Sequence, residues 1–218
     1  MYLEKIQSPE DVKKLDVEQL KVLAGEMRQA LIQKLSVHGG HVGPNLGMVE
    51  ATIAMHYVFD SPKDKMVFDV SHQSYCHKML TGRVDAFLDE AKYDDVSGYS
   101  EPSESAHDFF CIGHTSTSVS LACGLAKARD LADENYNVIA VIGDGSLSGG
   151  EALEGLDFAK ELNGNLIVVV NDNEMSIAEN HGGLYENLKL LRDTKGQAEC
   201  NIFKAMGLNY VFVEDGND

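Results

Sequence analysis

Short apolar runs rich in β-branched and aromatic residues alternate along this chain with segments of helical periodicity. Five of these runs are predicted to be strands, at residues 65–70, 108–112, 137–142, 165–170 and 209–213. Segments with helical spacing separate most of them, at residues 115–132, 149–162 and 199–206. Strands that are apolar almost throughout, with helices between them, are typical of a parallel sheet covered on both faces. The sequence therefore predicts an α/β fold, a mostly parallel sheet with helices on both faces.

The N-terminal segment, residues 1 to about 60, is predicted to be helical. Asp16 and Gln19 have the spacing of a capping box, and apolar residues follow at helical intervals until Gly39 and Gly40 end the helix. A second helix is expected over about 46–59. Long loops are predicted at residues 92–107 and 178–197.

The charge balance and the lack of long apolar stretches exclude several classes of function. The 18 Lys and Arg against 35 Asp and Glu give a formal net charge of −17, which argues against binding to nucleic acid or to an anionic membrane. No signal peptide and no stretch of transmembrane length is visible. The 4 cysteines form no C-x-x-C pair and no zinc spacing, so they are interpreted as reduced thiols of a cytoplasmic protein.

The stretch "VIGDGSLSGGEALEGL" (141–156) leads from a predicted strand through a Gly-rich turn into a predicted helix, as phosphate-binding loops do. It lacks the Lys of a P-loop, and Ser148 stands where a dinucleotide fingerprint has its third Gly. Its most prominent residue is an acid, Asp144. The next strand ends in "NDNEM" (171–175), so Asn173 follows Asp144 by 29 positions. Hard oxygen donors at neighbouring strand ends, beside a helix N-terminus, suit a Mg²⁺ ion that bridges to a diphosphate.

Each of these two stretches has a simpler interpretation by itself. A lone Gly-Asp-Gly turn is most often a turn whose Asp caps the following helix, and Asn-Asp-Asn after a strand is often an Asx-rich turn. Their combination at this spacing, each at the end of an apolar strand, favours a cofactor site.

The joint pattern is typical of thiamine diphosphate enzymes, and the chain resembles the N-terminal, diphosphate-binding domain of the transketolase superfamily. Within it, the chain is most similar to the 1-deoxy-D-xylulose 5-phosphate synthases. The resemblance rests on "GGHVGPNLGMVEATIAMHYVFDSPKDKMVFDVSHQSYCHKMLTGR" (39–83), "GHTSTS" (113–118), "GDGSLSGGEALEGL" (143–156) and "NDNEMSIAENHGGL" (171–184). The part "DVSHQSYCHKMLTGR" is far more specific than the cofactor motif, which the wider superfamily shares.

The resemblance implies thiamine diphosphate and Mg²⁺ as cofactors and a role for individual residues. The metal ligands would be the side chains of Asp144 and Asn173 and the carbonyl of Met175. The cofactor would be contacted by His72, Gly113, His114, Thr115, Gly145, Ser146 and Asn173. The catalytic residues would be His41, which would face the reacting carbon and transfer protons on the substrate, and His72.

The histidines also have structural interpretations. His38 with His41, and His72 with His77, are spaced like metal-binding pairs, but no Cys or carboxylate with zinc spacing accompanies them. His56 falls close to the apolar face of a predicted helix and is expected in the core.

The chain departs from the synthase pattern in two places. In the loop "VSGYSEPSESAHD" (96–108), Pro102 stands where the synthases carry an Arg before the Glu-Ser pair. The run "GPNLG" (43–47) differs from the small-residue run usual after the His.

We expect residues 1–218 to form a single cofactor-binding domain, without the pyrimidine-side and C-terminal domains of the family. In this family a second domain carries the Glu that activates the cofactor, and most contacts to the substrate phosphate lie outside the first domain. The missing domains are expected in the same chain or as a separate subunit. The resemblance also implies a cytoplasmic homodimer.

The predicted function is that of a transferase of isoprene biosynthesis, which makes 1-deoxy-D-xylulose 5-phosphate from pyruvate and a phosphorylated aldose, glyceraldehyde 3-phosphate. The chain alone is expected to be inactive. Two alternatives stay open. One is the N-terminal subunit of a split transketolase that moves two-carbon ketol units between sugar phosphates, and the other is a non-catalytic cofactor-binding module.

Overall fold

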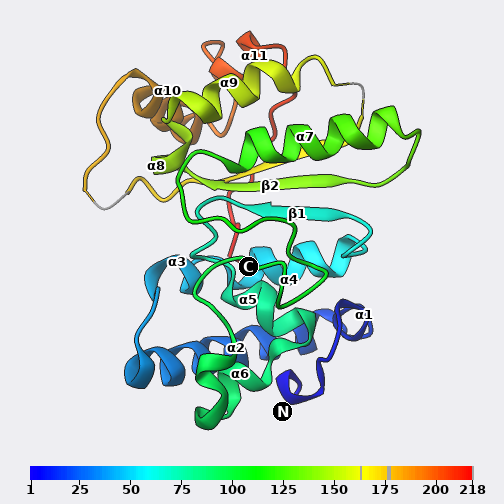
Figure 1. Cartoon of the computed structure of the whole chain (residues 1–218). Coiled ribbons are helices and arrows are strands. Elements are labelled where there is room, and N and C mark those ends of the chain that lie inside the picture. Colours follow the sequence, from blue (N-terminus) through cyan, green and yellow to red (C-terminus); the bar gives the residue numbers. More distant parts are fainter. Residues whose placement is uncertain (163, 176–177, 218) are drawn as a thin grey trace. The chain divides into compact units, whose positions relative to one another are not determined.

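The computed structural model of the chain describes residues 1–162, 164–175 and 178–217. The chain divides into two compact units (Figure 1). Unit 1 comprises Met1–Gly113 with the end of the chain from Gly216, and unit 2 comprises His114–Asp215. Unit 1 is mainly helical, whereas unit 2 combines parallel strands with helices.

Short helices and one long helix make up most of unit 1. Its α-helices are α1 (Pro9–Val12), α2 (Val17–His38), α3 (Gly43–Leu46), α4 (Val49–Val58), α5 (Tyr75–Lys78) and α6 (Asp85–Leu88). The remaining elements are the 3₁₀ segments η1 (Leu3–Lys5) and η3 (Glu90–Asp95), the π-helical turn η2 (Met79–Arg83) and the strand β1 (Lys65–Phe68).

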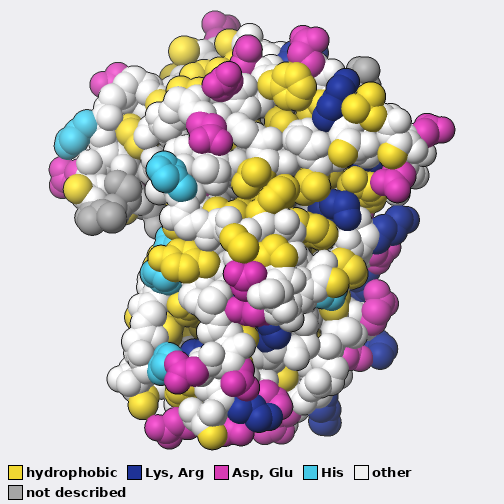
Figure 2. Space-filling view, viewed as in Figure 1, with side chains coloured by type: hydrophobic (Ala, Val, Ile, Leu, Met, Phe, Trp, Pro, Cys, Tyr) yellow, Lys and Arg dark blue, Asp and Glu magenta, His cyan; other side chains and the backbone are white. Residues whose placement is uncertain are grey.

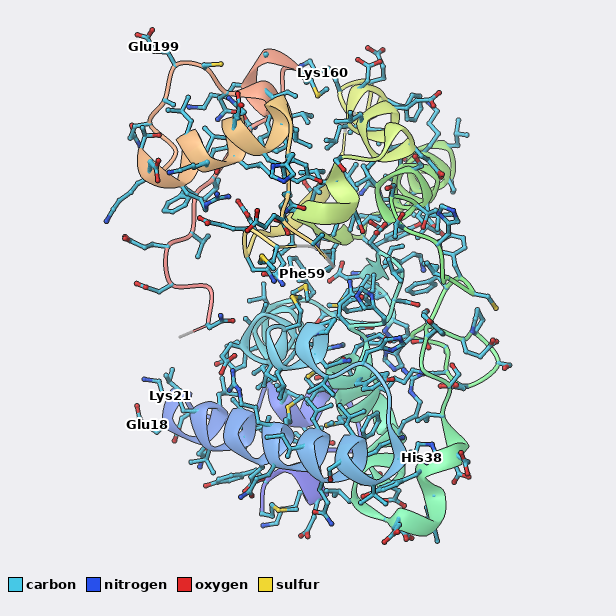
Figure 3. The ribbon with its side chains drawn as sticks, turned by 90° about the vertical axis from the view of Figure 1, so that its left-hand side faces the viewer. Glu18, Lys21, His38, Phe59, Lys160 and Glu199 are labelled. Atoms are coloured by element: carbon cyan, nitrogen blue, oxygen red, sulfur yellow. The ribbon has the colours of Figure 1, made fainter. Side chains whose placement is uncertain are left out.

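Helix α2 begins and ends where the sequence predicts. The Asp16 carboxylate accepts a hydrogen bond from the Gln19 backbone N–H, and the Gln19 side chain accepts one from the Asp16 N–H, which satisfies two donors at the helix start. At the other end Gly39 has φ +80°, in the left-handed region that favours glycine. Figure 3 labels Glu18 in the first turn of α2 and His38 at its far end.

One face of α2 carries the core of unit 1. The residues that recur every three or four positions on this face are buried: Leu23, Met27, Leu31 and Leu35. They pack in the same apolar cluster as Ile53 of α4 and Phe87 of α6. This packing fixes the C-terminal end of α2, from which the following turn departs.

Unit 2 is organised around two parallel strands, β2 (Val138–Gly143) and β3 (Leu166–Asn171). Their register pairs Val138 with Leu166 at one end and Gly143 with Asn171 at the other. The helices of unit 2 are α7 (Ser118–Leu131), α8 (Asp144–Leu147), α9 (Gly150–Ala159), α10 (Gly183–Asp193) and α11 (Ile202–Ala205). Helix α7 lies along β2 with α9 beside it (Figure 1). The carboxyl ends of β2 and β3 therefore lie side by side, as the sequence predicts.

Two of the predicted strands are wrong. Residues 108–112 form a loop, because the Asp108 side chain is held by ion pairs and the Ile112 carbonyl accepts a hydrogen bond from Ser71 Oγ instead of from a strand. Residues 209–213 also lie outside regular structure. Their valines are 81% and 69% exposed, since an apolar segment becomes a strand only where another strand offers its edge.

The helix predictions also need correction. The predicted loop 178–197 contains α10, whose Leu184, Leu188 and Leu191 recur at helical spacing, with the last two buried. The helix expected over about 46–59 is α4, which begins later, at Val49, after the short α3 has ended at Leu46. The helix expected over 199–206 is reduced to the four residues of α11.

Within the part of the chain that the structure describes, no helix is long and apolar enough to cross a membrane. On the face of the molecule drawn in Figure 2, Asp and Glu side chains are interspersed with Lys, Arg and apolar side chains. The negative charge on this face is therefore spread out and does not form a single patch.

Candidate active site

The predicted catalytic residues and metal ligands fall into two groups, one in each unit. Of the other predicted cofactor contacts, Gly113 belongs to unit 1, whereas His114, Thr115, Gly145 and Ser146 belong to unit 2. The histidine cluster, in unit 1, consists of His41, Asn45, His72, Tyr75 and Tyr99. The strand-end cluster, in unit 2, consists of the residues that follow β2 and β3 and their side-chain partners: Asp144, Asp172, Asn173, Met175, Asn180 and Arg192.

His41 lies three residues beyond His38, which Figure 3 labels at the end of α2. The half-buried His41 ring has Nδ1 3.2 Å from the Tyr75 hydroxyl and Nε2 3.5 Å from the Tyr99 hydroxyl. The His72 ring lies edge-on to it, with 5.5 Å between the ring centroids. Burial lowers the pKa of His41, so the ring is neutral near pH 7.

His72 lies in a strained turn after β1. Val70 and Ser71 just before it have positive φ values of 56° and 67°, which are unusual for residues other than glycine, above all for a β-branched one. The His72 Nδ1 atom is buried and has no hydrogen-bond partner among the described residues. Burial, and the nearby His41, lower the pKa of His72. A buried ring nitrogen without a partner is available to a ligand.

Asn45 joins the two turns that carry these histidines. It is fully buried in α3, and its Nδ2 donates to the carbonyls of His41 and His72, at 2.7 and 2.8 Å. Its Oδ1 accepts a hydrogen bond of 2.9 Å from the Tyr75 backbone N–H. A single amide therefore holds His41, His72 and Tyr75 in fixed positions relative to one another.

A pocket beside His41 has a buried cation in its wall, Lys34. The Lys34 Nζ donates to the carbonyls of Ala86 and Tyr93, at 2.9 and 2.8 Å, and lies 4.5 Å from the centroid of the Phe87 ring. Burial lowers the pKa of Lys34. Because carbonyls and an aromatic face already surround this ammonium group, it is a structural cation and not a ligand-binding group of the pocket.

Asp144 is the first residue of α8 and directly follows β2. Asp144 is only 2% exposed, and Asn180 Nδ2 donates a hydrogen bond to its Oδ2 at 2.8 Å. Burial, and the nearby charge of Asp172, raise the pKa of Asp144. Arg192, whose charge acts on Asp144, is engaged by Asp172 and by Glu174. The Asp144 carboxylate is therefore buried with no cation bound to it among the described residues, which is a position that a metal ion would stabilise.

The turn after β3 is built from side-chain to backbone hydrogen bonds. Asp172 Oδ1 accepts from the Glu174 N–H at 3.2 Å, and Asn173 Oδ1 accepts from the Met175 N–H at 3.1 Å. The simpler interpretation of "NDN", an Asx-rich turn, is therefore present in the structure. The turn does not exclude a ligand, because an amide oxygen that accepts one hydrogen bond keeps a second lone pair.

Two loops of unit 2 approach each other closely at Ser116 and Gly149. Ser116 has φ 69°, and its Oγ donates to the Ser146 carbonyl at 2.7 Å. A Cβ atom added to Gly149 would lie 1.9 Å from that Oγ, so only glycine fits there. His114 and Thr115 are exposed in the same turn as Ser116. The predicted diphosphate loop after β2 is therefore in contact with the part of the other loop that lies in unit 2, from His114 onward.

The strand-end cluster has the donors that Mg²⁺ prefers: a carboxylate from Asp144, an amide oxygen from Asn173 and a backbone carbonyl from Met175. No group of three or more His, Cys, Asp or Glu that could hold a metal occurs within the described ranges. A single carboxylate with neutral oxygens suits a Mg²⁺ ion that completes its coordination with phosphate oxygens and water. The residues present therefore fit a Mg²⁺-bound diphosphate.

The fold is that of a transketolase domain. The crystal structure of a transketolase variant from Pichia stipitis aligns with 90% of this chain and 32% of its own, with a TM-score of 0.68 at 19% sequence identity. At this identity the likeness shows the fold alone. The chain therefore has an α/β fold of the transketolase type.

A family model described as 1-deoxy-D-xylulose-5-phosphate synthase matches residues 3–201. The chain belongs to this family. The relative of that name from Dictyoglomus turgidum is 52% identical over 192 residues, 88% of this chain and 31% of the relative. The relative from Pelotomaculum thermopropionicum is 54% identical over 190 residues (87% and 30%), and that from Listeria monocytogenes serotype 4b is 45% identical over 220 residues (98% and 36%). The chain thus spans about a third of the length of these relatives.

His77, spaced like a metal-binding partner of His72, lies in the core. Its ring stacks on His56 at 5.0 Å, with Nδ1 2.9 Å from His56 Nε2 and Nε2 3.0 Å from Asp108 Oδ1. His56 is buried as the sequence predicts. His77 is therefore engaged by His56 and Asp108 in the core and does not form a metal-binding pair with His72.

Several residues of the two clusters were not found from the sequence: Asn45, Tyr75, Tyr99, Asn180 and Arg192. Asn45 gave one usable signal, a polar residue at the start of a helix whose neighbours are apolar or glycine. The two tyrosines and Asn180 gave none, because their contacts join segments far apart in the chain.

Proposed function

We propose that this chain is the thiamine diphosphate- and Mg²⁺-binding domain of a transferase that makes 1-deoxy-D-xylulose 5-phosphate from pyruvate and glyceraldehyde 3-phosphate. The observation that carries the proposal is the buried Asp144 carboxylate at the end of β2, beside the Asx-rich turn that follows β3. Membership of the family supports the choice of reaction, since the relatives matched bear the name of this synthase.

The strand-end cluster would hold the metal and the diphosphate. Asp144 and Asn173 would supply side-chain oxygens and Met175 its carbonyl, and the pairing of Gly143 with Asn171 supports this because it brings the two strand ends together. The residues that would contact the diphosphate are Gly145, Ser146, Gly113, His114 and Thr115. The contact between Ser116 and Ser146 supports joint use of these two loops.

The histidine cluster would act on the cofactor and the substrate. Thiamine diphosphate, when bound, supplies the electron sink for breaking and forming carbon–carbon bonds. His72, whose Nδ1 is buried without a partner in the described residues, would contact the cofactor. His41 would transfer a proton on the substrate's hydroxyl or carbonyl oxygen, and its neutral ring suits this role.

Residues 1–218 would serve as one functional domain, completed by the pyrimidine-side and C-terminal parts in the same polypeptide or in another subunit. The share of the relatives that the chain covers supports this, at 31% of the Dictyoglomus turgidum protein. A cytoplasmic homodimer is part of the proposal. The net charge of −17 and the free cysteines support the location, and the resemblance to transketolases supports the dimer.

The loop 97–108 supports an alternative function, that of the N-terminal subunit of a split transketolase that moves two-carbon ketol units between sugar phosphates. Pro102 offers no cation to a substrate, and Glu104 in the same loop is paired with Lys78 and Arg83. Assays of the completed enzyme with pyruvate and with a ketose phosphate as alternative donors separate the two reactions. If the completed enzyme turns over neither donor, the remaining alternative is a non-catalytic cofactor-binding module.

Metal dependence tests the central observation. Isothermal titration calorimetry of thiamine diphosphate, with and without Mg²⁺, should show Mg²⁺-dependent binding to the chain and none to Asp144→Ala, while both keep the same circular dichroism spectrum. Asp157→Ala, an exposed Asp on α9, is the matched control and should bind as the unchanged chain does. Unchanged Mg²⁺-dependent affinity in Asp144→Ala would rule out the metal assignment.

Proton transfer by His41 has a separate test. In the completed enzyme His41→Ala should lower kcat by about 10²–10⁴-fold, with a melting temperature close to that of the unchanged protein because the ring is only half-buried. His38→Ala, at the end of α2 and paired with the exposed Asp94, is the control and should keep its activity. A large loss of stability without a specific loss of kcat would make His41 a structural residue.

A further inference from the structure

The His41 ring is enclosed between two phenols. Tyr75 is nearly buried, and its hydroxyl lies 3.2 Å from Nδ1, whereas the partly exposed Tyr99 has its hydroxyl 3.5 Å from Nε2. Gly40 and Gly98 border the Tyr75 hydroxyl so closely that a Cβ atom on either would lie 2.9 or 3.3 Å from it. A side chain at position 40 or 98 would therefore crowd the phenol oxygen.

The hydrogen bonds of Tyr75 determine which way its proton points. The backbone N–H of His41 donates to the Tyr75 oxygen at 3.4 Å, so this oxygen already acts as an acceptor. Among the described residues, the only other atom hydrogen-bonded to this hydroxyl is His41 Nδ1. Within the described residues, the phenolic proton therefore has one acceptor, His41 Nδ1.

The geometry points to Tyr75 as the residue that fixes the tautomer of His41, with the ring proton on Nε2. A neutral imidazole that accepts at Nδ1 must carry its proton on the other nitrogen. The Nε2–H then points towards Tyr99. Tyr75 is thus a positioning residue, which acts on the substrate only through His41.

The protonation states of the two side chains agree with this arrangement. Burial raises the pKa of Tyr75, which keeps the phenol protonated, and burial lowers the pKa of His41, which keeps the ring neutral. The other titratable groups near the ring are His72, beside it, and His38 and Lys34, which line the same pocket.

The consequence for chemistry rests on the proposed function. With its proton on Nε2, His41 offers a hydrogen-bond donor, and it suits a substrate carbonyl or alkoxide oxygen better than a hydroxyl that has to lose its proton. The 3.5 Å separation from the Tyr99 hydroxyl is long for a hydrogen bond, so an aldehyde oxygen can replace Tyr99 as the acceptor. The class of substrate group recognised here is therefore a carbonyl oxygen, as in an acceptor aldehyde.

Nitrogen NMR of the 218-residue chain tests the tautomer without any cofactor. Long-range ¹H–¹⁵N spectra, with the His41 signals identified by their loss in His41→Gln, should show a protonated Nε2 and an unprotonated Nδ1. The opposite pattern for His41 in the unchanged chain overturns the inference.

Two matched variants give the residue-specific test, with the His41 pKa measured from the same spectra. Tyr75→Phe removes a donor that stabilises the neutral ring, so the His41 pKa should rise and the two nitrogen signals should move towards a mixture of tautomers. Tyr99→Phe removes an acceptor for Nε2–H, so the pKa should not rise and Nδ1 should stay unprotonated. Equal effects of the two variants would overturn the role of Tyr75.

Kinetics separate this inference from the proposed function. In the completed enzyme, Tyr75→Phe should lower kcat by about ten-fold with little change in KM, since an interaction that matters only during proton transfer is lost. If the tautomer is as expected but His41→Ala keeps full activity, the proposed role of His41 is wrong and the structural inference stands. If Tyr75→Phe leaves both the tautomer and kcat unchanged, the inference fails by itself.

Discussion

His77 Nε2 lies 3.0 Å from Asp108 Oδ1, and both side chains are at most 2% exposed. Arg83 donates to both oxygens of the same carboxylate, at 2.7 and 3.0 Å. Because a carboxylate only accepts, His77 donates from Nε2 and accepts from His56 at Nδ1. This buried chain of Arg83, Asp108, His77 and His56 ties the loop before residue 113 to α4, α5 and the turn η2.

Replacing Asp108 by Asn should destabilise the protein strongly. Burial disfavours the Asp108 charge, but the hydrogen bonds from His77 and Arg83 outweigh burial and hold the pKa of this carboxyl well below its usual range. Removing one partner of a buried ion pair costs about 3–5 kcal/mol, or roughly 10 °C in the melting temperature of a chain of this size. Thermal unfolding followed by circular dichroism measures the effect.

The control for this variant is Asp94→Asn, which removes the exposed carboxylate paired with His38. Exposed pairs contribute about 0–1 kcal/mol, so its melting temperature should stay within roughly 3 °C of the original. Similar melting temperatures for the two variants would show that the Asp108 network is not needed for stability.

The same network, together with His107, whose ring centroid lies 6.4 Å from that of His77, predicts lower stability in mild acid. Burial lowers the pKa of His56 and of His77, and lowers that of His107 to about 4. Unfolded histidines titrate near 6.5, so below that pH the unfolded chain binds more protons than the folded one. The free energy of unfolding should therefore fall as the pH drops from about 6.5 towards 4.

Melting temperatures across this range test the pH dependence. His107→Asn should give a flatter profile, because one of the histidines that resists protonation is gone. His38→Asn, near the surface, is the control and should leave the slope as it is. A melting temperature that is constant between pH 7 and 5 contradicts the prediction.

The features predicted from the sequence are those with a local signal. The strands β2 and β3 are continuous apolar runs, and the helix between them fixes how their ends meet, so the common edge of Asp144 and Asn173 follows from spacing. The bonds from Asn45 to His72 and Tyr75, and the contact of Tyr75 with His41, have no such signal, because they join residues 27 to 34 positions apart. Their partners depend on how α2, α3 and α5 pack.

Removing the Asn45 side chain should loosen both histidine turns. Asn45→Ala leaves the carbonyls of His41 and His72 and the N–H of Tyr75 without their partner, and each buried polar group left unpaired costs about 1–3 kcal/mol. The melting temperature should fall by at least about 5 °C, and the Tyr75 amide should exchange with deuterium at least ten-fold faster.

Asn187→Ala is a suitable control for the Asn45 variant. Asn187 also bonds to two backbone groups through its amide, at the Cys200 carbonyl and the Ile202 N–H, but it lies at the surface of unit 2. Water can replace its hydrogen bonds, so the loss of stability should be smaller. Unchanged exchange of the Tyr75 amide in Asn45→Ala would contradict this role of Asn45.

The purified 218-residue chain should bind thiamine diphosphate with Mg²⁺ but should not turn over pyruvate. The proposed roles of its residues cover the metal, the diphosphate and proton transfer, and the chain corresponds to 36% of the Listeria monocytogenes relative. Adding a polypeptide equivalent to the rest of that relative should give pyruvate- and glyceraldehyde 3-phosphate-dependent turnover. The same mixture with Asp144→Ala should be inactive, and robust turnover by the chain alone contradicts the proposal.

Gly149→Ala should disrupt the contact between the two loops of unit 2. The new Cβ would lie 1.9 Å from Ser116 Oγ and 2.5 Å from Ser116 Cβ, so one loop must move. Overpacking of this kind costs about 1–3 kcal/mol, and the displaced loops should also bind Mg²⁺–thiamine diphosphate more weakly. Gly150→Ala is the control, because a Cβ there meets no atom within 4 Å.

A second substitution separates the clash from other effects of the alanine. Ser116→Gly removes both atoms that the new methyl group would hit, and glycine also accepts the φ of 69° at this position without strain. It loses the hydrogen bond to the Ser146 carbonyl, worth about 0.5–1.5 kcal/mol. In the double variant the alanine should therefore cost much less than in the single one, and the double-mutant cycle should show a coupling of about 1 kcal/mol or more. Additive effects would mean that the two loops are not in contact in solution, and the joint diphosphate site would lose its structural basis.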